Sequence, residues 1–440
     1  MDSSKLLLYD AFAFLDSSMT YYYSVKTNKA KKGRRPTQYR KRFKSYWNQL
    51  PKAAMLAAII ACGLLLYAVF LMPGSHPHHP KVTRLPKRPL ASVSRPSAAV
   101  AKTNLYYGLA LGDTLLGLNS SKLNNELSSI AATGATWIRI DVSWADIQPQ
   151  NANQYDWSAL DRIVAAANQH GLKILATLAY TPPWARPTDC SSSQQCAPAS
   201  TSQFAKFVAV VTKRYAPKDI DAWEIWNEPN LEGFWQPAPS PLDYTRLLQA
   251  SYHAIKQIEP TATIVSGGLG SLDNSRASIP QVMFLSDMYA DGAKPYFDVL
   301  GYHPYSFPAL PSHVATWSGW SMMADLPQSI RSVMIANGDG AKQIWITEFG
   351  APTNGPGALA TTSNPNYALH ADHVSNALQT NMLTDAITQY KKTPWLGAFF
   401  WYTYQDSGTS TSSNQNFFGL LNYNGTPKPA YTAFHTAITK

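Results

Sequence analysis

The sequence predicts a (β/α)8 barrel as the main domain of this chain. Eight short apolar runs, rich in β-branched and aromatic residues, alternate with longer helical patterns between residues 104 and 440. Such alternation is typical of parallel strands joined by helices. A glutamate ends the fourth of these runs and another lies near the end of the seventh, and an uncharged stretch of 20 residues lies upstream at 53–72. We therefore expect one barrel with polar groups at its strand ends, preceded by a transmembrane helix.

Each of the eight strands is predicted from its own apolar run. Helical patterns separate them, as in 158–171, where Leu160, Ile163 and Val164 recur at helical spacing and Gly171 ends the pattern. A doubly wound open sheet is the alternative, but the stretch after the first strand lacks the glycine-rich loop that binds phosphates. The predicted strands are 105–112, 136–144, 173–180, 221–228, 263–268, 297–305, 343–350 and 396–404.

The positive charge of the chain is confined to its N-terminal part. The net charge is +10, but residues 1–102 carry 18 Lys and Arg against 3 Asp and Glu, whereas residues 103–440 carry 19 against 24. The basic run could bind nucleic acid, but basic residues beside a membrane helix more often set its orientation or contact anionic lipid. We expect no nucleic-acid partner, and the charge says nothing about an acidic substrate of the barrel.

The stretch 53–72 predicts a transmembrane helix, because 20 residues at about 1.5 Å each match a hydrocarbon core of about 30 Å. Ten basic residues between Lys26 and Lys44 predict a cytoplasmic N-terminus. A cleaved signal peptide has an apolar region of about 7–15 residues close to the N-terminus, so an uncleaved anchor fits better. A lipoprotein processing box at 59–62 is disfavoured, since the apolar run continues past Cys62.

Four regions follow from these features. Residues 1–52 form a basic cytoplasmic tail, 53–72 a membrane helix in contact with lipid, 73–103 a disordered linker rich in Pro, Ser and Lys, and 104–440 an extracytoplasmic domain. In an oxidising compartment Cys190 and Cys196 are expected to form a disulfide, since a zinc site would need more ligands nearby. The histidines at 76–79 are attributed to linker composition, and no metal site is predicted.

Polar and aromatic residues gather at the predicted strand ends. Two carboxylates, Glu228 and Glu348, project from the fourth and seventh strands, which face each other across a barrel. Glycoside hydrolysis uses such a pair: one carboxylic acid protonates the leaving oxygen, and the other acts as a nucleophile at about 5–5.5 Å or as a base at about 6.5–9.5 Å. The remaining strand-end residues are Arg139, Trp144, Tyr180, Asn227, His303, Tyr305 and Trp401.

Two motifs carry a family resemblance. The stretch W-E-I-W-N-E-P-N at 223–230 resembles the acid/base motif of glycoside hydrolase clan A, and W-I-T-E-F-G-A-P at 345–352 resembles the nucleophile motif of that clan. The stretches 134–149 and 160–185 are most similar to family 39, with the cellulase-like family 5 as the alternative. The resemblance covers nearly all of 104–438 and implies a (β/α)8 barrel that retains anomeric configuration.

The resemblance also implies roles for the strand-end residues. Glu228 would be the acid/base and Glu348 the nucleophile, with no metal or organic cofactor. Glu224, four residues before the acid/base, is expected to be a buried carboxylate paired with a base such as Arg139. The substrate-binding group would comprise Asn227 at the sugar 2-hydroxyl, Arg139 and Tyr305 against the nucleophile, His303 in the wall, Trp401 in the floor and Trp144 on a sugar face.

The sequence thus predicts a membrane-anchored, retaining β-glycosidase of an extracellular or cell-surface polysaccharide. Long loops at 182–200, 231–241, 306–323 and 353–373 favour an endo-type groove. The alternatives are a catalytically silent carbohydrate-binding barrel and an exo-acting β-xylosidase or β-glucosidase. The tail could also act as a cytoplasmic docking segment. Half or more of the loop and strand-end tryptophans are expected in the core; these are Trp144, Trp184, Trp226, Trp235, Trp317 and Trp320.

Overall fold

The computed structural model describes residues 105–190, 192–216, 219–271, 275–363 and 371–440. The predicted tail, the transmembrane helix at 53–72 and the linker lie outside the described residues. Among the helices of the described ranges, none combines the length and the apolar character needed to cross a membrane.

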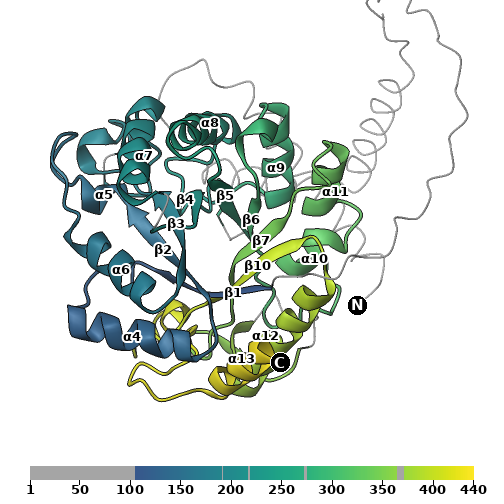
Figure 1. Cartoon of the computed structure of the whole chain (residues 1–440). Helices are drawn as coiled ribbons and strands as arrows, with labels where there is room; N and C mark the ends of the chain where they lie inside the picture. Colours follow the sequence, from purple (N-terminus) through teal and green to yellow (C-terminus); the bar gives the residue numbers. More distant parts are fainter. Residues whose placement is uncertain (1–104, 191, 217–218, 272–274, 364–370) are drawn as a thin grey trace, which may run out of the picture. The chain divides into compact units, whose positions relative to one another are not determined.

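Eight parallel strands close into a barrel, as predicted (Figure 1). Each predicted run overlaps an observed strand, and the first strand pairs with the last to complete the ring. Around the barrel the order is β1-β10-β7-β6-β5-β4-β3-β2. The strands are β1 (Tyr106–Gly112), β2 (Trp137–Ser143), β3 (Lys173–Ala179), β4 (Ala222–Asn227), β5 (Thr263–Gly270), β6 (Leu300–His303), β7 (Ile344–Phe349) and β10 (Leu396–Tyr402).

Helices surround the strands on the outside of the ring (Figure 1). The helices are α4 (Ser120–Ala132), α5 (Trp144–Ile147), α6 (Ser158–Gln169), α7 (Thr201–Tyr215), α8 (Pro241–Ile258), α9 (Gln281–Ala290), α10 (Gly319–Ala324), α11 (Ile330–Ala336), α12 (Asn376–Lys392) and α13 (Pro429–Thr439). Short 3-10 helices lie at η1 (Pro183–Ala185), η2 (Lys294–Tyr296) and η4 (Asn414–Phe417).

Local sequence explains where the helices begin and which side they bury. In α8, Ser240 caps the N-terminus by accepting a hydrogen bond from the backbone N–H of Asp243, and Pro241 occupies the first turn, where its missing N–H has no partner to lose. In α6, Leu160, Ile163 and Val164 are buried against the strands. The predicted helical spacing at 158–171 therefore describes the side of α6 that packs on the barrel.

The barrel interior changes from apolar to polar along the strands. One layer consists of small, branched and aromatic side chains: Ala110, Trp137, Leu175, Ala222, Val265, Val299, Trp345, Ala398 and Phe400. Further along β2 and β4, the interior positions carry Arg139 and Glu224, both buried. This polar layer lies toward the carboxyl ends of the strands, where barrels of this kind place their active sites.

The loop predicted at 353–373 contains structure that the sequence did not predict. Strands β8 (Ala358–Ala360) and β9 (Ala371–Val374) form a separate two-stranded parallel sheet between β7 and α12. Strands of three and four residues are too short for an alternation of apolar and polar residues to be recognised.

A buried ion pair fixes the loop after β10. Lys428 Nζ lies 2.7 Å from Asp406 Oδ1 and also donates to the carbonyl of Phe417 and the hydroxyl of Thr353. Both charged side chains are buried. Asp406 lies in the loop after β10, but its carboxylate points inward as the partner of Lys428. The pair thus connects the loops that follow β7 and β10.

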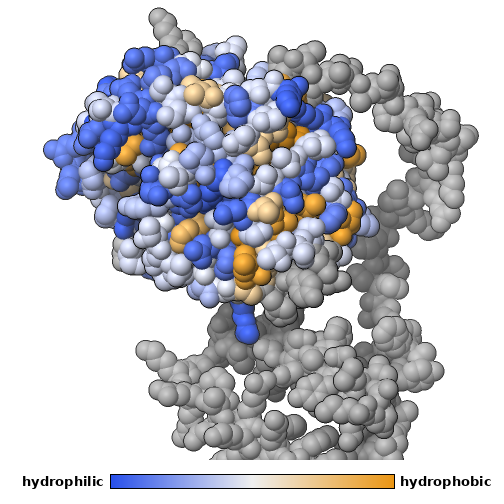
Figure 2. Space-filling model, turned by 90° about the horizontal axis from the view of Figure 1, so that it is seen from below, coloured by the Kyte–Doolittle hydropathy of each residue, from blue (hydrophilic) through white to orange (hydrophobic). Residues whose placement is uncertain are grey.

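The face of the domain shown in Figure 2 is predominantly polar. On this face the apolar residues form several small groups. Scattered apolar groups of this kind are ordinary on a water-exposed surface and need no partner to cover them.

We predict that Lys428→Met lowers the free energy of unfolding by about 3–5 kcal/mol, because it leaves the Asp406 carboxylate buried without its cation. Denaturant titration followed by circular dichroism measures this loss. Lys173→Met is the control: its pair with Asp221 is half exposed, so the change should stay below about 1 kcal/mol. Equal losses in the two variants would contradict the prediction.

Candidate active site

The end of β4 has an unusual backbone that points Glu228 into the barrel mouth. Trp226 and Glu228 both have positive φ, 71° and 44°, which costs about 1–3 kcal/mol for residues other than glycine. The Trp226 ring packs outward against Trp235 and donates its N–H to the carbonyl of Phe234. Asn230 stabilises the turn by bonding both backbone groups of Gly270; sequence reasoning assigned Asn230 no role.

Arg139 connects β2, β4 and β7 through three hydrogen bonds. Its Nε donates to Glu224 Oε2 at 2.5 Å, Nη1 to Glu348 Oε1 at 2.6 Å and Nη2 to Asn227 Oδ1 at 2.7 Å. Glu224 also accepts from Thr177 Oγ1 and from the backbone N–H of Gly268. Glu224 is therefore the buried structural partner of Arg139, as the sequence predicted.

Glu348 is surrounded by groups that favour its ionised form. Tyr305 donates its hydroxyl to Glu348 Oε2 at 2.9 Å, while Arg139 binds the other oxygen. Burial alone would raise the pKa of Glu348, but the charges of His303 and Arg139 and these hydrogen bonds outweigh burial and hold the pKa below its ordinary value. Glu348 thus remains a carboxylate in moderately acidic solution.

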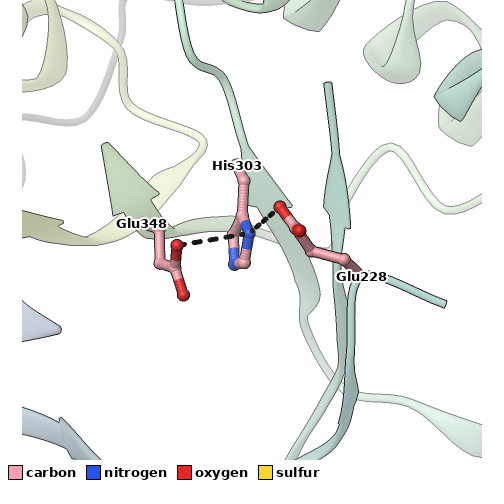
Figure 3. Close-up of side chains that lie close together, drawn as sticks. All are labelled: Glu228, His303 and Glu348. Atoms are coloured by element: carbon pink, nitrogen blue, oxygen red, sulfur yellow. Dashed lines mark hydrogen bonds and ion pairs between the residues drawn. The ribbon is translucent and has the colours of Figure 1, made fainter. Parts of the chain in front are cut away.

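Glu228 has the opposite character. Burial raises the pKa of its carboxyl, and the opposing hydrogen bond and charge of His303 only reduce the increase. His303 Nδ1 lies 2.8 Å from Glu228 Oε1 and 3.7 Å from Glu348 Oε2, and Figure 3 shows its ring between the two glutamates. One carboxyl group is therefore suited to give a proton while the other is suited to attack.

The separation of the two carboxyl groups indicates how they act. Glu228, His303 and Glu348 each offer a side-chain atom, and these atoms lie within 4.8 Å of one another. Inverting enzymes keep their carboxyl groups about 6.5–9.5 Å apart to admit a water molecule, whereas retaining enzymes bring them to about 5–5.5 Å. The shorter separation here fits a retaining pair.

The same three side chains could offer ligand atoms to a metal ion. Each, however, already has a hydrogen-bond partner within the chain, and the positive charge of Arg139 lies against Glu348. This environment favours one protonated and one ionised carboxyl group over cation binding.

The structure contradicts the predicted role of Trp144. Its ring is fully buried among the helices, stacked with Phe207 and in edge contact with Phe204 and Trp184. The reason is that β2 ends at Ser143 and Trp144 begins α5, so its side chain no longer follows the strand alternation. Trp226, Trp235 and Trp320 are buried too, while Trp184 and Trp317 are partly exposed.

The structure also contradicts the predicted role of Trp401. The side chain is fully buried on the helix-facing side of β10, in edge contact with Phe349. Its neighbour Tyr402 packs with the interior cluster and is partly exposed. Burial raises the pKa of Tyr402, and the charges of Glu348 and Asp141 raise it further. Tyr402 therefore occupies the interior position expected of Trp401.

Asp141 is a third carboxyl group near the mouth that the sequence reading missed. It lies one alternation beyond Arg139 on β2. Burial raises its pKa to about 7, with Arg139 opposing the rise and the charge of Glu348 adding to it. The alternation along W-I-R-I-D could have identified it, since Trp137, Arg139 and Asp141 share one face of the strand.

The disulfide predicted in the loop after β3 is present. Cys190 and Cys196 are joined, and both are buried. The backbone beside this disulfide binds the loop after β4: the N–H of Ala197 donates to the carbonyl of Gln236, and the N–H of Gln236 to that of Gln195. The loops after β3 and β4 are thus held together on the catalytic side.

A (β/α)8 barrel with a proton-retaining carboxyl and an ionised carboxylate at the ends of its fourth and seventh strands defines a class, the retaining glycoside hydrolases. The model of the family described as Cellulase (glycosyl hydrolase family 5) matches residues 113–395, which include both glutamates. This chain belongs to that family, within clan A. The resemblance found in the sequence named family 39 first and family 5 second.

Other known proteins share part of the sequence or the fold. A β-xylosidase of Caldicellulosiruptor saccharolyticus is 26% identical over 233 residues, 50% of this chain and 42% of the relative, so this chain spans less than half the length of that relative. A family 39 glycoside hydrolase of Bacteroides cellulosilyticus WH2 has a TM-score of 0.55 at 21% identity over 76% of this chain and 63% of that chain.

Two further solved structures show the same barrel. The family 39 enzyme of Xanthomonas axonopodis pv. citri has a TM-score of 0.56 at 17% identity over 77% of this chain and 67% of that one. Xylanase 10B of Thermotoga maritima has a TM-score of 0.51 at 15% identity over 76% and 95%. At these identities the likeness concerns the fold.

We predict that Tyr305→Phe moves the acid limb of the pH profile of kcat/KM upward by about one to two pH units. The substitution removes a hydrogen bond to a charged group, worth about 1.5–3 kcal/mol, so the pKa of Glu348 rises and the carboxylate is lost at a higher pH. Initial rates on an aryl glycoside measure the profile. Tyr423→Phe, at a 55% exposed position, should leave it unchanged, and a shift confined to the alkaline limb would contradict the assignment.

Proposed function

We propose that this protein is a retaining β-glycosidase that hydrolyses the O-glycosidic bonds of a polysaccharide outside the cytoplasm, with Glu348 as nucleophile and Glu228 as acid/base. The observation that carries the proposal is the pair itself: one oxygen of each carboxyl group lies within 4.8 Å of the other, and one group has a raised pKa while the other has a lowered pKa. Environments that separate the pKa values of two neighbouring carboxyl groups divide the acid and nucleophile roles between them.

In the first step Glu348 attacks the anomeric carbon as the glycosidic C–O bond breaks. The proton of Glu228 passes to the departing oxygen, and the sugar becomes covalently bound to Glu348. Arg139 and Tyr305 hold the attacking carboxylate in place. Asn227, whose Oδ1 is fixed by Arg139, is oriented to bind the sugar 2-hydroxyl through its amide N–H, a contact that strengthens in the transition state.

In the second step Glu228 is a carboxylate and takes a proton from water. That water attacks the anomeric carbon from the side the leaving group vacated, the bond to Glu348 breaks, and the original configuration returns. His303 lies 2.8 Å from Glu228 and can keep its hydrogen bond to this side chain whether the carboxyl group is protonated or ionised. A sugar hydroxyl in place of water would give transglycosylation by the same steps.

We propose endo-type cleavage, supported by the long connection 304–318 after β6 and by the long connection after β7 that contains β8 and β9. Of the tryptophans in the predicted loops, Trp235 and Trp320 belong to the core, whereas Trp184 and Trp317 are partly exposed. We also propose that the stretch 53–72 anchors the protein to a membrane with the barrel outside, supported by its uncharged length and the basic residues before it. The disulfide of Cys190 and Cys196 agrees with an oxidising compartment.

The catalytic pair is tested with the full-length protein and two variants on aryl β-glycosides. We expect Glu348→Ala to abolish turnover of every substrate. Glu228→Ala should lower kcat/KM by about 10²–10⁴-fold for substrates with poor leaving groups and far less for good ones, since only the former need a proton. Turnover in Glu348→Ala, or equal losses for both substrate types in Glu228→Ala, would refute the assigned roles.

The cleavage mode is tested by product size on β-glucan, xylan and mannan. Endo action predicts an early fall in viscosity with oligosaccharide products, because bonds inside the chain break first. Release of monosaccharide alone, with viscosity unchanged, would show exo action and contradict the endo proposal. Gel filtration and reducing-end assays on the same samples measure both quantities, with Glu348→Ala as the blank.

A further inference from the structure

Two buried polar atoms beneath the catalytic pair have no hydrogen-bond partner in the described part of the chain. They are His303 Nε2 and Thr347 Oγ1, and both side chains are fully buried. They face the same small space beside Gly268, because a Cβ built on Gly268 would come within 2.2 Å of Nε2 and 2.7 Å of Oγ1, but they make no direct hydrogen bond to each other. Leaving a buried donor or acceptor without a partner costs about 1–3 kcal/mol, so one water molecule that bonds both atoms is expected between them.

The charges around His303 favour the protonated, positively charged form of its ring. On β2, Arg139 contributes one positive charge, but it is bonded to two carboxylates, Glu224 and Glu348. Glu228, at the end of β4, is neutral when it holds its proton. From the loop after β6 comes the neutral hydroxyl of Tyr305, and β5 contributes only glycine at Gly268. Asp141, further along β2, adds a second uncompensated negative charge whenever it is ionised. Without a charge on His303 this buried group would therefore carry a net charge of −1 or −2, which is unfavourable in a site with little water.

We propose that Thr347 is linked to Nε2–H of His303 through one water, which accepts from Nε2–H and donates to the Thr347 hydroxyl, and thereby holds His303 as the doubly protonated imidazolium. In that form both ring nitrogens are donors. Nδ1–H faces Glu228 and Glu348 (Figure 3), and Nε2–H needs an acceptor, which a water bonded to the Thr347 hydroxyl would supply. Thr347 touches no substrate and is a positioning residue.

Through this contact Thr347 affects the charge of His303, and the charge of His303 acts on the nucleophile Glu348. Among the influences that keep Glu348 ionised, the charge of His303 is the largest. A hydroxyl one residue before the nucleophile would therefore help keep that nucleophile ionised, although the two side chains do not bond. The inference rests on the proposed function, because the ionised Glu348 matters only if it attacks the sugar.

A purely structural role for Thr347 makes a different prediction. If the side chain only fills space, valine, which has the same shape without the hydroxyl, should serve as well as threonine. Serine keeps the hydroxyl but loses the methyl group. The pair Thr347→Val and Thr347→Ser therefore separates the hydrogen bond from the packing.

The experiment measures the protonation of His303 in the full-length protein without using turnover. The ten histidines are labelled with ¹⁵N in the ring, and the His303 signals are identified by their loss in His303→Gln. We expect both nitrogens of His303 to be protonated in the wild type at pH 6, with a titration midpoint above the ordinary 6.5. A single protonated nitrogen at pH 6 would overturn the proposal, and this outcome needs no Thr347 variant to fold.

The variants give the second result. We expect Thr347→Val to lower the His303 midpoint by about one pH unit, since the water that accepts from this charged N–H loses its partner, and Thr347→Ser to retain the wild-type midpoint. In Thr347→Val the acid limb of kcat/KM should also move upward. An unchanged midpoint in Thr347→Val would overturn the proposal. If the protein proves inactive on every glycoside, the ¹⁵N titration still decides the role of Thr347 separately from the proposed function.

Discussion

The arrangement of the site depends on the buried guanidinium of Arg139. Its three hydrogen bonds reach Glu224 and Asn227 from β4 and Glu348 from β7, so one side chain sets the relative position of strands on opposite sides of the barrel. The planar fork of Arg suits this role because its donors diverge at fixed angles. Breaking one of these pairs would leave a charge without a partner in the interior, which is why Glu224 matters although it does not face the substrate.

Around this anchor, the protein gives two chemically identical carboxyl groups different properties. Glu348 is surrounded by donors and positive charge, whereas Glu228 has His303 as its side-chain partner and is otherwise dominated by burial. The backbone contributes too, since Trp226 and Glu228 hold positive φ angles that the Asn230 contacts to Gly270 keep in place. Local strain is thus used where orientation matters most.

Sequence reasoning reached the barrel, the positions of its strands and the side chains around Glu348, because strand ends of a closed parallel barrel converge on one face. It failed where a strand does not alternate between apolar and polar residues. In L-G-A-F-F-W-Y both faces of β10 are apolar, so nothing in the letters distinguished Trp401 from Tyr402. Trp144 was misplaced because β2 ends one residue earlier. The burial of the Asp406 side chain was not predicted, because its partner Lys428 is distant in the sequence and cannot be read from the local pattern.

The pairing of β1 with β10 has a consequence for how the protein is made. The strands that close the barrel, Tyr106–Gly112 and Leu396–Tyr402, lie near opposite ends of the domain. At a synthesis rate of about 5–20 residues per second, β10 follows β1 after about 15–60 s. Until then the nascent sheet has two unpaired edges, which are prone to pair with other chains. A chaperone would therefore be needed most before β10 is synthesised, when it could cover β1 and the other unpaired edge of the sheet.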